Sequence, residues 1–325
     1  MDGLKGKSVV VTGASGYIGS KLVNELLKHS CEVIRVCREP STSFENSALI
    51  EGDIRSKSVW QKIVARADVI YHLAGNTSVY EAAKNPVESL NSGLLPINHL
   101  IDVLQGCQSK PRVIFASTAT VYGLTPRLPV SEISQPMPIT IYDLHKLFVE
   151  QQLSLASREG LMESVSLRLS NVYGPSLGIS AKDRGVLNKV TLRALNGENL
   201  LVYGDGDYLR DYVYIDDVVY AFLLIGSKKE INSGVYNVSS GKSISVEEAF
   251  KMVAWRASLS TGKNVNVNYA PWPIGANPIE YRDYVADIRC ISSQIGWRPK
   301  IDLASGIDCM VEEMIKARKI QRAFQ

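Results

Sequence analysis

Two side chains in this sequence have the types and the spacing for proton transfer. Tyr142 and Lys146 are four residues apart in a stretch of helical periodicity, so they share one face of the predicted helix. A free phenol has a pKa of about 10, but a neighbouring ammonium favours the phenolate. The pair could exchange a proton with a substrate hydroxyl, or be an ordinary exposed pair. Upstream, Ser117 and Thr118 end a predicted strand, where a hydroxyl could bind the same substrate oxygen or serve only a turn.

A glycine-rich segment directly follows the first apolar run. Gly13, Gly16 and Gly19 have the spacing G-x-x-G-x-x-G and stand between a predicted strand and a predicted helix. The first glycine permits a tight turn, the second lets a pyrophosphate approach the backbone, and the third lets helix and strand pack closely. The start of the helix would present free N–H groups to the phosphates. Glycines also punctuate ordinary turns, but this place in the chain favours a dinucleotide site.

Residues after the second and third predicted strands bear on which dinucleotide binds. Cys37 stands where an acidic residue commonly holds the ribose 2′-hydroxyl, and Arg38 follows it. Arg38 could pair with a 2′-phosphate or stack on adenine, or it could be a solvated arginine with Glu39 at the ribose. We therefore expect NADP(H) rather than NAD(H). Asp53 could accept a hydrogen bond from the adenine amino group, or it could cap the helix that follows.

Short apolar runs that alternate with helical patterns indicate the elements that position these residues. The runs fall at 8–11, 32–36, 48–50, 68–73 and 112–116, and the helical patterns at 17–29, 57–66, 87–106 and 141–158. Near-continuous Val/Ile strands between helices predict a parallel sheet covered on both faces, which is a doubly wound α/β (Rossmann) fold. Such a sheet binds ligands beyond the carboxyl ends of its strands.

The fourth of these runs ends in a histidine followed by small residues. We interpret His72 as a core histidine whose hydrogen bonds are satisfied within the protein. Ala74 and Gly75 follow it and would let a cofactor pass close to the backbone.

The chain is predicted to have two parts. Residues 1–174 would form the dinucleotide-binding Rossmann domain, and 175–325 would be mainly a smaller α/β lobe that binds substrate. Residues 211–240 again have the texture of sheet and covering helix, so we expect them to return to the first domain.

Composition excludes several classes of protein. The 36 basic and 33 acidic residues are well mixed and give a net charge of +3, which argues against a nucleic-acid or acidic-membrane surface. No apolar run approaches the roughly 20 residues that cross a bilayer, and we expect no signal peptide. Five cysteines without a CxxC pair argue against a disulfide framework or a metal site, so we expect a cytoplasmic protein without a bound metal.

With these motifs in this order, the chain resembles the extended short-chain dehydrogenase/reductase family, in its nucleotide-sugar epimerase/dehydratase branch, and is UDP-glucose 4-epimerase-like. The resemblance covers nearly the whole chain. It rests on the glycine triplet, Gly52-Asp53-Ile54, His72-Leu73-Ala74-Gly75, Asn91, the segment from Ser117 to Gly123, Tyr142/Lys146 with Glu150, the segment from Leu167 to Pro175, the segments 202–206 and 210–218, and Gly296-Trp297-Arg298-Pro299-Lys300.

The resemblance implies roles for the matching positions. Tyr142 would exchange a proton with the sugar hydroxyl, usually at C4, Lys146 would hold the nicotinamide ribose, and Thr118 would bind the reacting oxygen. The implied cofactor-binding residues are Gly13, Ser15, Gly16, Tyr17, Ile18, Gly19, Arg38, Asp53, Ile54, Leu73, Ala74, Gly75, Asn91, Ser117, Tyr142, Lys146, Leu169, Asn171 and Val172. The implied substrate-binding residues are Ser78, Val79, Thr118, Asn171, Val186, Val202, Tyr203, Arg210 and Arg282. Arg210 would clamp the diphosphate, and Arg282 would be a second clamp or a surface ion-pair partner.

Departures from the family pattern narrow the choice of reaction. The 4,6-dehydratases of this family carry an Asp-Glu pair after the catalytic threonine, where this chain has Ala119 and Thr120, so we expect no dehydration. Two activities remain as candidates, a 4-epimerase that retains its cofactor and an NADPH-dependent 4-ketoreductase. His145 stands where the family often has serine, and we expect it to face away from Tyr142.

Other classes remain as alternatives. A non-catalytic dinucleotide sensor would have no need for the acid/base residues, and a reductase of another carbonyl would have no need for a diphosphate arginine. We expect a nucleotide-diphosphate sugar as substrate. The family further implies a homodimer that pairs the helices near 87–106 and 141–158.

Overall fold

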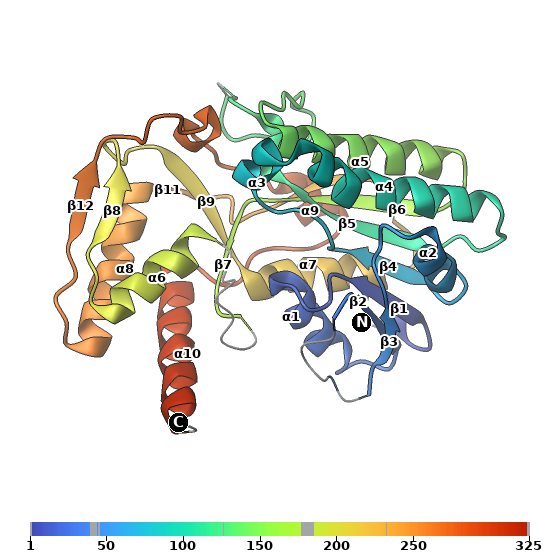
Figure 1. Cartoon of the computed structure of the whole chain (residues 1–325), viewed down its shortest axis with the longest axis horizontal. Helices are drawn as coiled ribbons and strands as arrows, with labels where there is room; N and C mark the ends of the chain where they lie inside the picture. The colour runs from blue at the N-terminus through green and yellow to red at the C-terminus, as the bar shows by residue number, and fades with distance from the viewer. Residues whose placement is uncertain are drawn as a thin grey trace.

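The computed structural model describes residues 2–39, 44, 46–125, 127–176, 185–231 and 233–323. Its larger lobe is built on seven parallel strands in the order β10-β6-β5-β4-β1-β2-β3 (Figure 1). These strands are β1 (Ser8–Thr12), β2 (Glu32–Cys37), β3 (Ala48–Glu51), β4 (Val69–His72), β5 (Arg112–Thr118), β6 (Glu163–Leu169) and β10 (Gly234–Val238). The predicted doubly wound α/β fold is confirmed.

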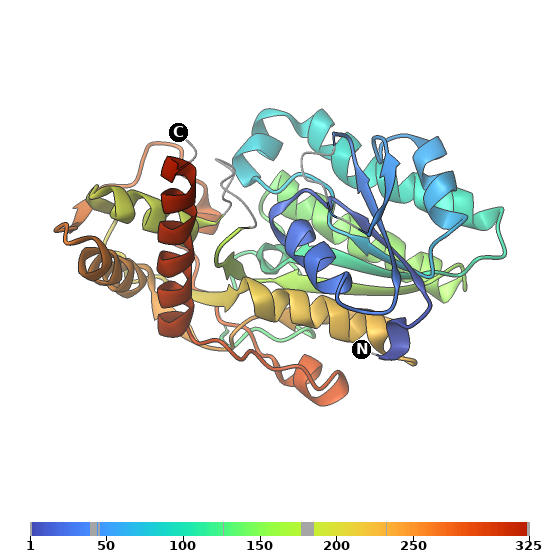
Figure 2. The same ribbon diagram turned by 90° about the horizontal axis from the view of Figure 1, so that it is seen from below.

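Helices cover both faces of this sheet. One face packs against α1 (Tyr17–Leu26) and α7 (Ile215–Ser227), and the other against α2 (Lys57–Val64), α4 (Pro86–Gln105) and α5 (Ile141–Arg158). Figure 2 shows α1 and α7 together on one side of the strands. Central strands buried on both faces need apolar residues at successive positions, which explains the continuous runs in the sequence.

The element bounds differ from the predicted ones at a few places. α1 ends at Leu26, three residues before the predicted end, and a short helix, α3 (Val79–Lys84), was not predicted. α4 continues through Pro96, although an interior proline removes one backbone hydrogen bond. The short helix η2 (Ala119–Tyr122) directly follows β5, so the chain turns immediately after Thr118.

The smaller lobe has its own core. Strands β8 (Leu200–Tyr203) and β12 (Val267–Ala270) pair in parallel, and the helices α6 (Val186–Asn196), α8 (Val246–Thr261) and α10 (Leu303–Ala323) pack together beside them (Figure 1). Between the lobes lies a second sheet of β11 (Ser243–Ser245), β9 (Leu209–Tyr214) and β7 (Asn171–Tyr173).

Segments late in the chain rejoin the larger lobe. β10 pairs with β6 in the seven-stranded sheet, and α7 packs on that sheet. The short helix α9 (Arg289–Gln294) and the buried Trp297 join the same core, which was not predicted. Over the stretches of chain that the structure describes, none of the helices combines the length and apolar character needed to span a membrane.

Candidate active site

A cavity of about 690 Å³ lies at the carboxyl ends of the parallel strands. Its walls include residues at or just beyond the ends of β1, β4, β5 and β6, which is where a doubly wound sheet binds ligands. The residues predicted for the site that line it are Gly13, Ser15, Gly16, Tyr17, Ile18, Gly19, Arg38, Asp53, Ile54, Leu73, Ala74, Gly75, Ser117, Thr118, Tyr142, Lys146, Leu169, Asn171, Val172 and Val186.

The glycine turn has the close contacts that its spacing predicts. Gly13 has a φ of 67°, and a Cβ there would lie 2.8 Å from the backbone nitrogen of Ala74. A Cβ on Gly19 would lie 2.1 Å from the carbonyl oxygen of Gly13. A Cβ is therefore excluded at Gly13 and Gly19, and α1 begins at Tyr17, directly after Gly16. A helix start with free N–H groups beside an open cavity fits a pyrophosphate.

Polar side chains at the ends of β2 and β3 line another part of the cavity. Arg38 is exposed there, and the Asp53 carboxylate accepts hydrogen bonds from Arg55 at 2.6 Å and 2.9 Å. These hydrogen bonds from Arg55 lower the pKa of Asp53. The alternative interpretation of Asp53 as a helix cap was wrong, because α2 starts at Lys57 and its N-cap position is Ser56. Arg55 was not predicted to be in the site.

Lys146 is held in place by its backbone partner rather than by a carboxylate. Its Nζ donates to the carbonyl oxygen of Ala116 at 2.8 Å and lies 4.6 Å from the centre of the Phe115 ring. The same atom is 5.9 Å from the centre of the Tyr142 ring. Burial lowers the pKa of Lys146 to about 8, although Glu150 acts in the opposite direction.

The two hydroxyls at the end of β5 have different surroundings. Ser117 is buried, and its hydroxyl donates to the carboxylate of Glu150. Glu150 also forms a buried ion pair with Arg168 at 2.6 Å. Thr118 is less buried, and its hydroxyl is 2.9 Å from that of Thr120. The hydroxyl of Ser117 is therefore used for a hydrogen bond inside the core.

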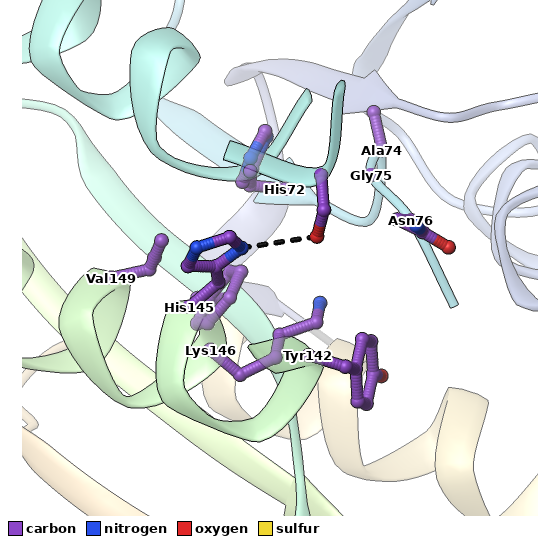
Figure 3. Close-up of a pocket in the computed structure, with 11 residues that line it drawn as sticks. His72, Ala74, Gly75, Asn76, Tyr142, His145, Lys146 and Val149 are labelled. Carbon is purple, nitrogen blue, oxygen red and sulfur yellow. Dashed lines mark hydrogen bonds between the residues drawn. The ribbon is translucent and has the colours of Figure 1, made fainter. Parts of the chain in front are cut away.

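The two histidines near the site behave differently from each other. Nδ1 of His72 is 2.9 Å from Oγ1 of Thr12, and burial lowers the pKa of His72 to about 3, so it is a neutral core residue as predicted. The expectation that His145 faces away from Tyr142 was wrong, since both line one small pocket with Lys146. Figure 3 shows the three side chains on the side of α5 that faces Ala74 to Asn76. His145 is held there because its Nδ1 lies 3.0 Å from Oγ of Ser89.

Seven residues predicted for the site do not line the large cavity. Ser78 caps α3, Val202 lies in the core of the smaller lobe, and Tyr203 stacks on Trp272 at 5.4 Å. The chain therefore uses these three side chains for capping and packing. The full set outside the cavity lining is Ser78, Val79, Asn91, Val202, Tyr203, Arg210 and Arg282.

The two arginines of this set are buried neighbours. Arg210 is 7% exposed and donates to the backbone carbonyls of Leu209, Glu280 and Arg282. Arg282 donates to the carbonyl of Ile279 at 3.0 Å, and its Nε has no hydrogen-bond partner among the residues described. Burial and the charge of Arg210 lower the pKa of Arg282 to about 10. The surface ion pair considered for Arg282 was wrong, because the side chain is buried.

Comparisons with known proteins agree with this geometry. Residues 9–239 match the model of the NAD-dependent epimerase/dehydratase family. The chain is similar to the UDP-glucose 4-epimerase of Thermotoga maritima, solved with UDP-glucose, at 30% identity and a TM-score of 0.85, covering 96% of this chain and 99% of the other. The UDP-glucose 4-epimerase of Thermus thermophilus, solved with NAD, is 28% identical with a TM-score of 0.82 over 95% and 99%. The dTDP-4-dehydro-6-deoxyglucose reductase of Escherichia coli is 28% identical over 97% and 99%.

Proposed function

The chain belongs to the NAD-dependent epimerase/dehydratase family, and we propose that it is an NAD(P)-dependent enzyme that performs redox chemistry at C4 of a nucleotide-diphosphate sugar. The function nearest to this geometry is that of a 4-epimerase. The observation that carries the proposal is the meeting of Thr118, Tyr142 and Lys146 in the same cavity as the glycine turn.

The residues of the cavity fit a dinucleotide. The Gly13–Gly19 turn has no room for a Cβ at its first and third glycines, so a pyrophosphate can approach the backbone and the N-terminus of α1. Arg38 and Asp53 would hold the adenosine end, and Lys146 the nicotinamide ribose. When bound, the nicotinamide supplies a hydride acceptor or donor.

The protein's own groups then handle the proton and the reacting oxygen. Tyr142 takes the proton of the C4 hydroxyl and later returns it. The Lys146 ammonium favours the phenolate of Tyr142 electrostatically, because a nearby positive charge stabilises the deprotonated form. Thr118 binds the same substrate oxygen and holds it near Tyr142. The positions of Ala119 and Thr120 hold no carboxylate pair for eliminating water.

A 4-ketoreductase is the second candidate. It is favoured by the similarity to the dTDP-4-dehydro-6-deoxyglucose reductase and by Arg38, which lines the cavity where a 2′-phosphate would lie. Glu39 is not part of the cavity lining, and Asp53 is already bound to Arg55. On this ground we propose that NADP(H) binds in preference to NAD(H).

Arg210 and Arg282, although outside the lining of the large cavity, are proposed to bind the substrate diphosphate. Two buried guanidinium groups that repel each other gain from an anion, and the Nε–H of Arg282 has no hydrogen-bond partner within the described part of the chain. Neither arginine forms an ion pair with a carboxylate in the part of the chain that the structure covers.

The outer faces of α4 and α5 bear on how the protein assembles. Exposed apolar side chains on α4 and α5, namely Val87, Leu90, Leu144, Phe148 and Leu155, support a homodimer through these helices.

We further propose that 1–174 with 211–240 forms the dinucleotide-binding domain, and the rest of 175–325 mainly the substrate lobe. The odd cysteine number without a CxxC pair supports a cytoplasmic location.

Two assays on the purified protein test this function. The released cofactor is identified, and UDP-sugars and dTDP-sugars are incubated with and without NADPH. Tightly held oxidised cofactor with interconversion of two C4 epimers supports the epimerase. Reversible NADPH binding with reduction of a 4-keto sugar supports the reductase. Failure of every sugar in both assays would overturn the proposal.

A further inference from the structure

A buried carboxylate directly follows the proposed catalytic tyrosine. Asp143 is fully buried, and its two oxygens accept hydrogen bonds from the hydroxyls of Thr120 and Thr140, the latter at 2.6 Å. Burial raises the pKa of Asp143, while the two threonines and the charge of Arg282 lower it. Asp143 was not among the residues predicted for the site. Its position links the catalytic helix α5 to the short helix η2 that follows Thr118.

The number of available protons decides which group donates in each hydrogen bond of this chain. An ionised carboxylate has only acceptor sites, and a threonine hydroxyl has one proton. Thr120 donates its proton to Oδ1 of Asp143, so in the 2.9 Å contact with Thr118 the Thr120 oxygen must accept. Thr118 therefore donates to Thr120. The backbone N–H of Thr120 donates to Oγ1 of Thr118 at 3.2 Å, which leaves one lone pair of Thr118 for the cavity.

We propose that Asp143 is a positioning residue that acts through Thr120 to hold the Thr118 hydroxyl as a hydrogen-bond acceptor toward the substrate. This inference rests on the proposed function. An alcohol at C4 can donate to such a hydroxyl, whereas a ketone cannot, because a carbonyl oxygen has no proton to give. The chain thus favours the alcohol form of the bound sugar over the 4-keto form. The C4 hydroxyl then turns from Thr118 to the Tyr142 phenolate when its proton is transferred.

The arrangement has a use in either candidate reaction. A 4-epimerase must keep its 4-keto sugar from accumulating and escaping, and a 4-ketoreductase must drive the ketone to the alcohol. Both reactions benefit when the site stabilises the bound alcohol more than the bound ketone.

The test measures how much of the bound nicotinamide is reduced at equilibrium with a sugar nucleotide. UDP-glucose and a dTDP-6-deoxyhexose are the probes, and the absorbance of reduced nicotinamide is the signal. Thr120→Val removes the hydroxyl and keeps the shape, so the Thr118 proton can turn to the ketone. We expect the ratio of reduced to oxidised nicotinamide to rise about fivefold, as one net hydrogen bond allows. Thr120→Ser keeps the hydroxyl and should keep the wild-type ratio.

A second variant and a stability control complete the design. Asp143→Ala should raise the ratio in the same direction, and combining it with Thr120→Val should add little, because both break one chain. Ser245→Ala removes the capping box of α8 in the other lobe and should lower the melting temperature without moving the ratio. A wild-type ratio in both Thr120→Val and Asp143→Ala, or an equal rise in Thr120→Ser, overturns the inference. A wild-type protein that neither interconverts C4 epimers nor reduces a 4-keto sugar overturns the proposed function and this inference with it.

Discussion

The ammonium of Lys146 lies 5.9 Å from the centre of the Tyr142 ring while its Nζ donates to the backbone carbonyl of Ala116. The carbonyl fixes the ammonium without neutralising it, so its charge still acts on the phenol. A carboxylate in the same place would cancel that charge. The nearest strong ion pair of α5, between Glu150 and Arg168, is instead kept in the core.

Replacing Tyr142 by phenylalanine removes the proton-transfer group and little else. We expect kcat to fall by about 10²- to 10⁴-fold, which is the usual contribution of general acid–base catalysis. Binding of the dinucleotide, measured by fluorescence titration, should change little, because the glycine turn is intact. Turnover at the wild-type rate would contradict the role of Tyr142.

The titration of Lys146 should appear in the pH dependence of the reaction. Burial lowers the pKa of Lys146 to about 8, so its ammonium is present below that pH and is lost above it. Without the positive charge the Tyr142 phenolate is less favoured. We expect kcat/KM to fall on the alkaline side above about pH 8, and Lys146→Met to remove this limb along with most of the activity. An alkaline limb that persists in that variant would assign it to another group.

The choice of cofactor tests Arg38. Arg38→Asp places a carboxylate where a 2′-phosphate would bind, so it repels NADP(H) and can accept from a ribose hydroxyl. The ratio of Kd values for NADPH and NADH should shift toward NADH by tenfold or more. No shift would show that the backbone or Glu39 governs the preference.

Arg282→Ala should weaken binding of the sugar nucleotide because the diphosphate loses a charge-assisted donor. We expect KM to rise about tenfold or more with a smaller change in kcat. The matched control is Arg289→Ala, since that side chain is 89% exposed and pairs only with Asp287 among the charged groups described. An equal KM for both variants would exclude Arg282 as a clamp.

Breaking the buried pair of α5 should cost stability. Glu150→Gln leaves the Arg168 guanidinium buried without its charge partner, so we expect a loss of about 3–5 kcal/mol in the free energy of unfolding. The control is Glu198→Gln, which breaks a solvent-exposed pair with Arg193 and should cost far less. Urea unfolding measures the loss of stability in both variants. Equal losses would contradict the expectation that burial makes the Glu150–Arg168 pair more important than the exposed pair.

Much of the fold could be predicted because its signals are local. The apolar runs of the parallel strands and the spacing of Gly13, Gly16 and Gly19 each depend on neighbouring residues alone. The same holds for Tyr142 and Lys146 on one helix face. These features needed no knowledge of tertiary contacts.

The unpredicted features depend on contacts between distant segments. Arg55 donates to Glu88, 33 positions further along the chain, and Thr120 reaches Asp143 across 23 positions. His145 turns toward the pocket because Ser89, on another helix, holds its ring. Side chains such as Val202 were expected in the cavity but lie in the core, since a sequence motif does not show which side of a strand faces the ligand.

A UDP-sugar that carries deuterium at C4 makes it possible to follow the transferred hydride itself. The wild-type protein should move the deuterium onto the bound nicotinamide, where mass spectrometry of the released cofactor detects it, and Tyr142→Phe should not do so at a comparable rate. A product formed with no deuterium appearing on the nicotinamide, or loss of the C4 deuterium to solvent, would contradict hydride transfer at C4.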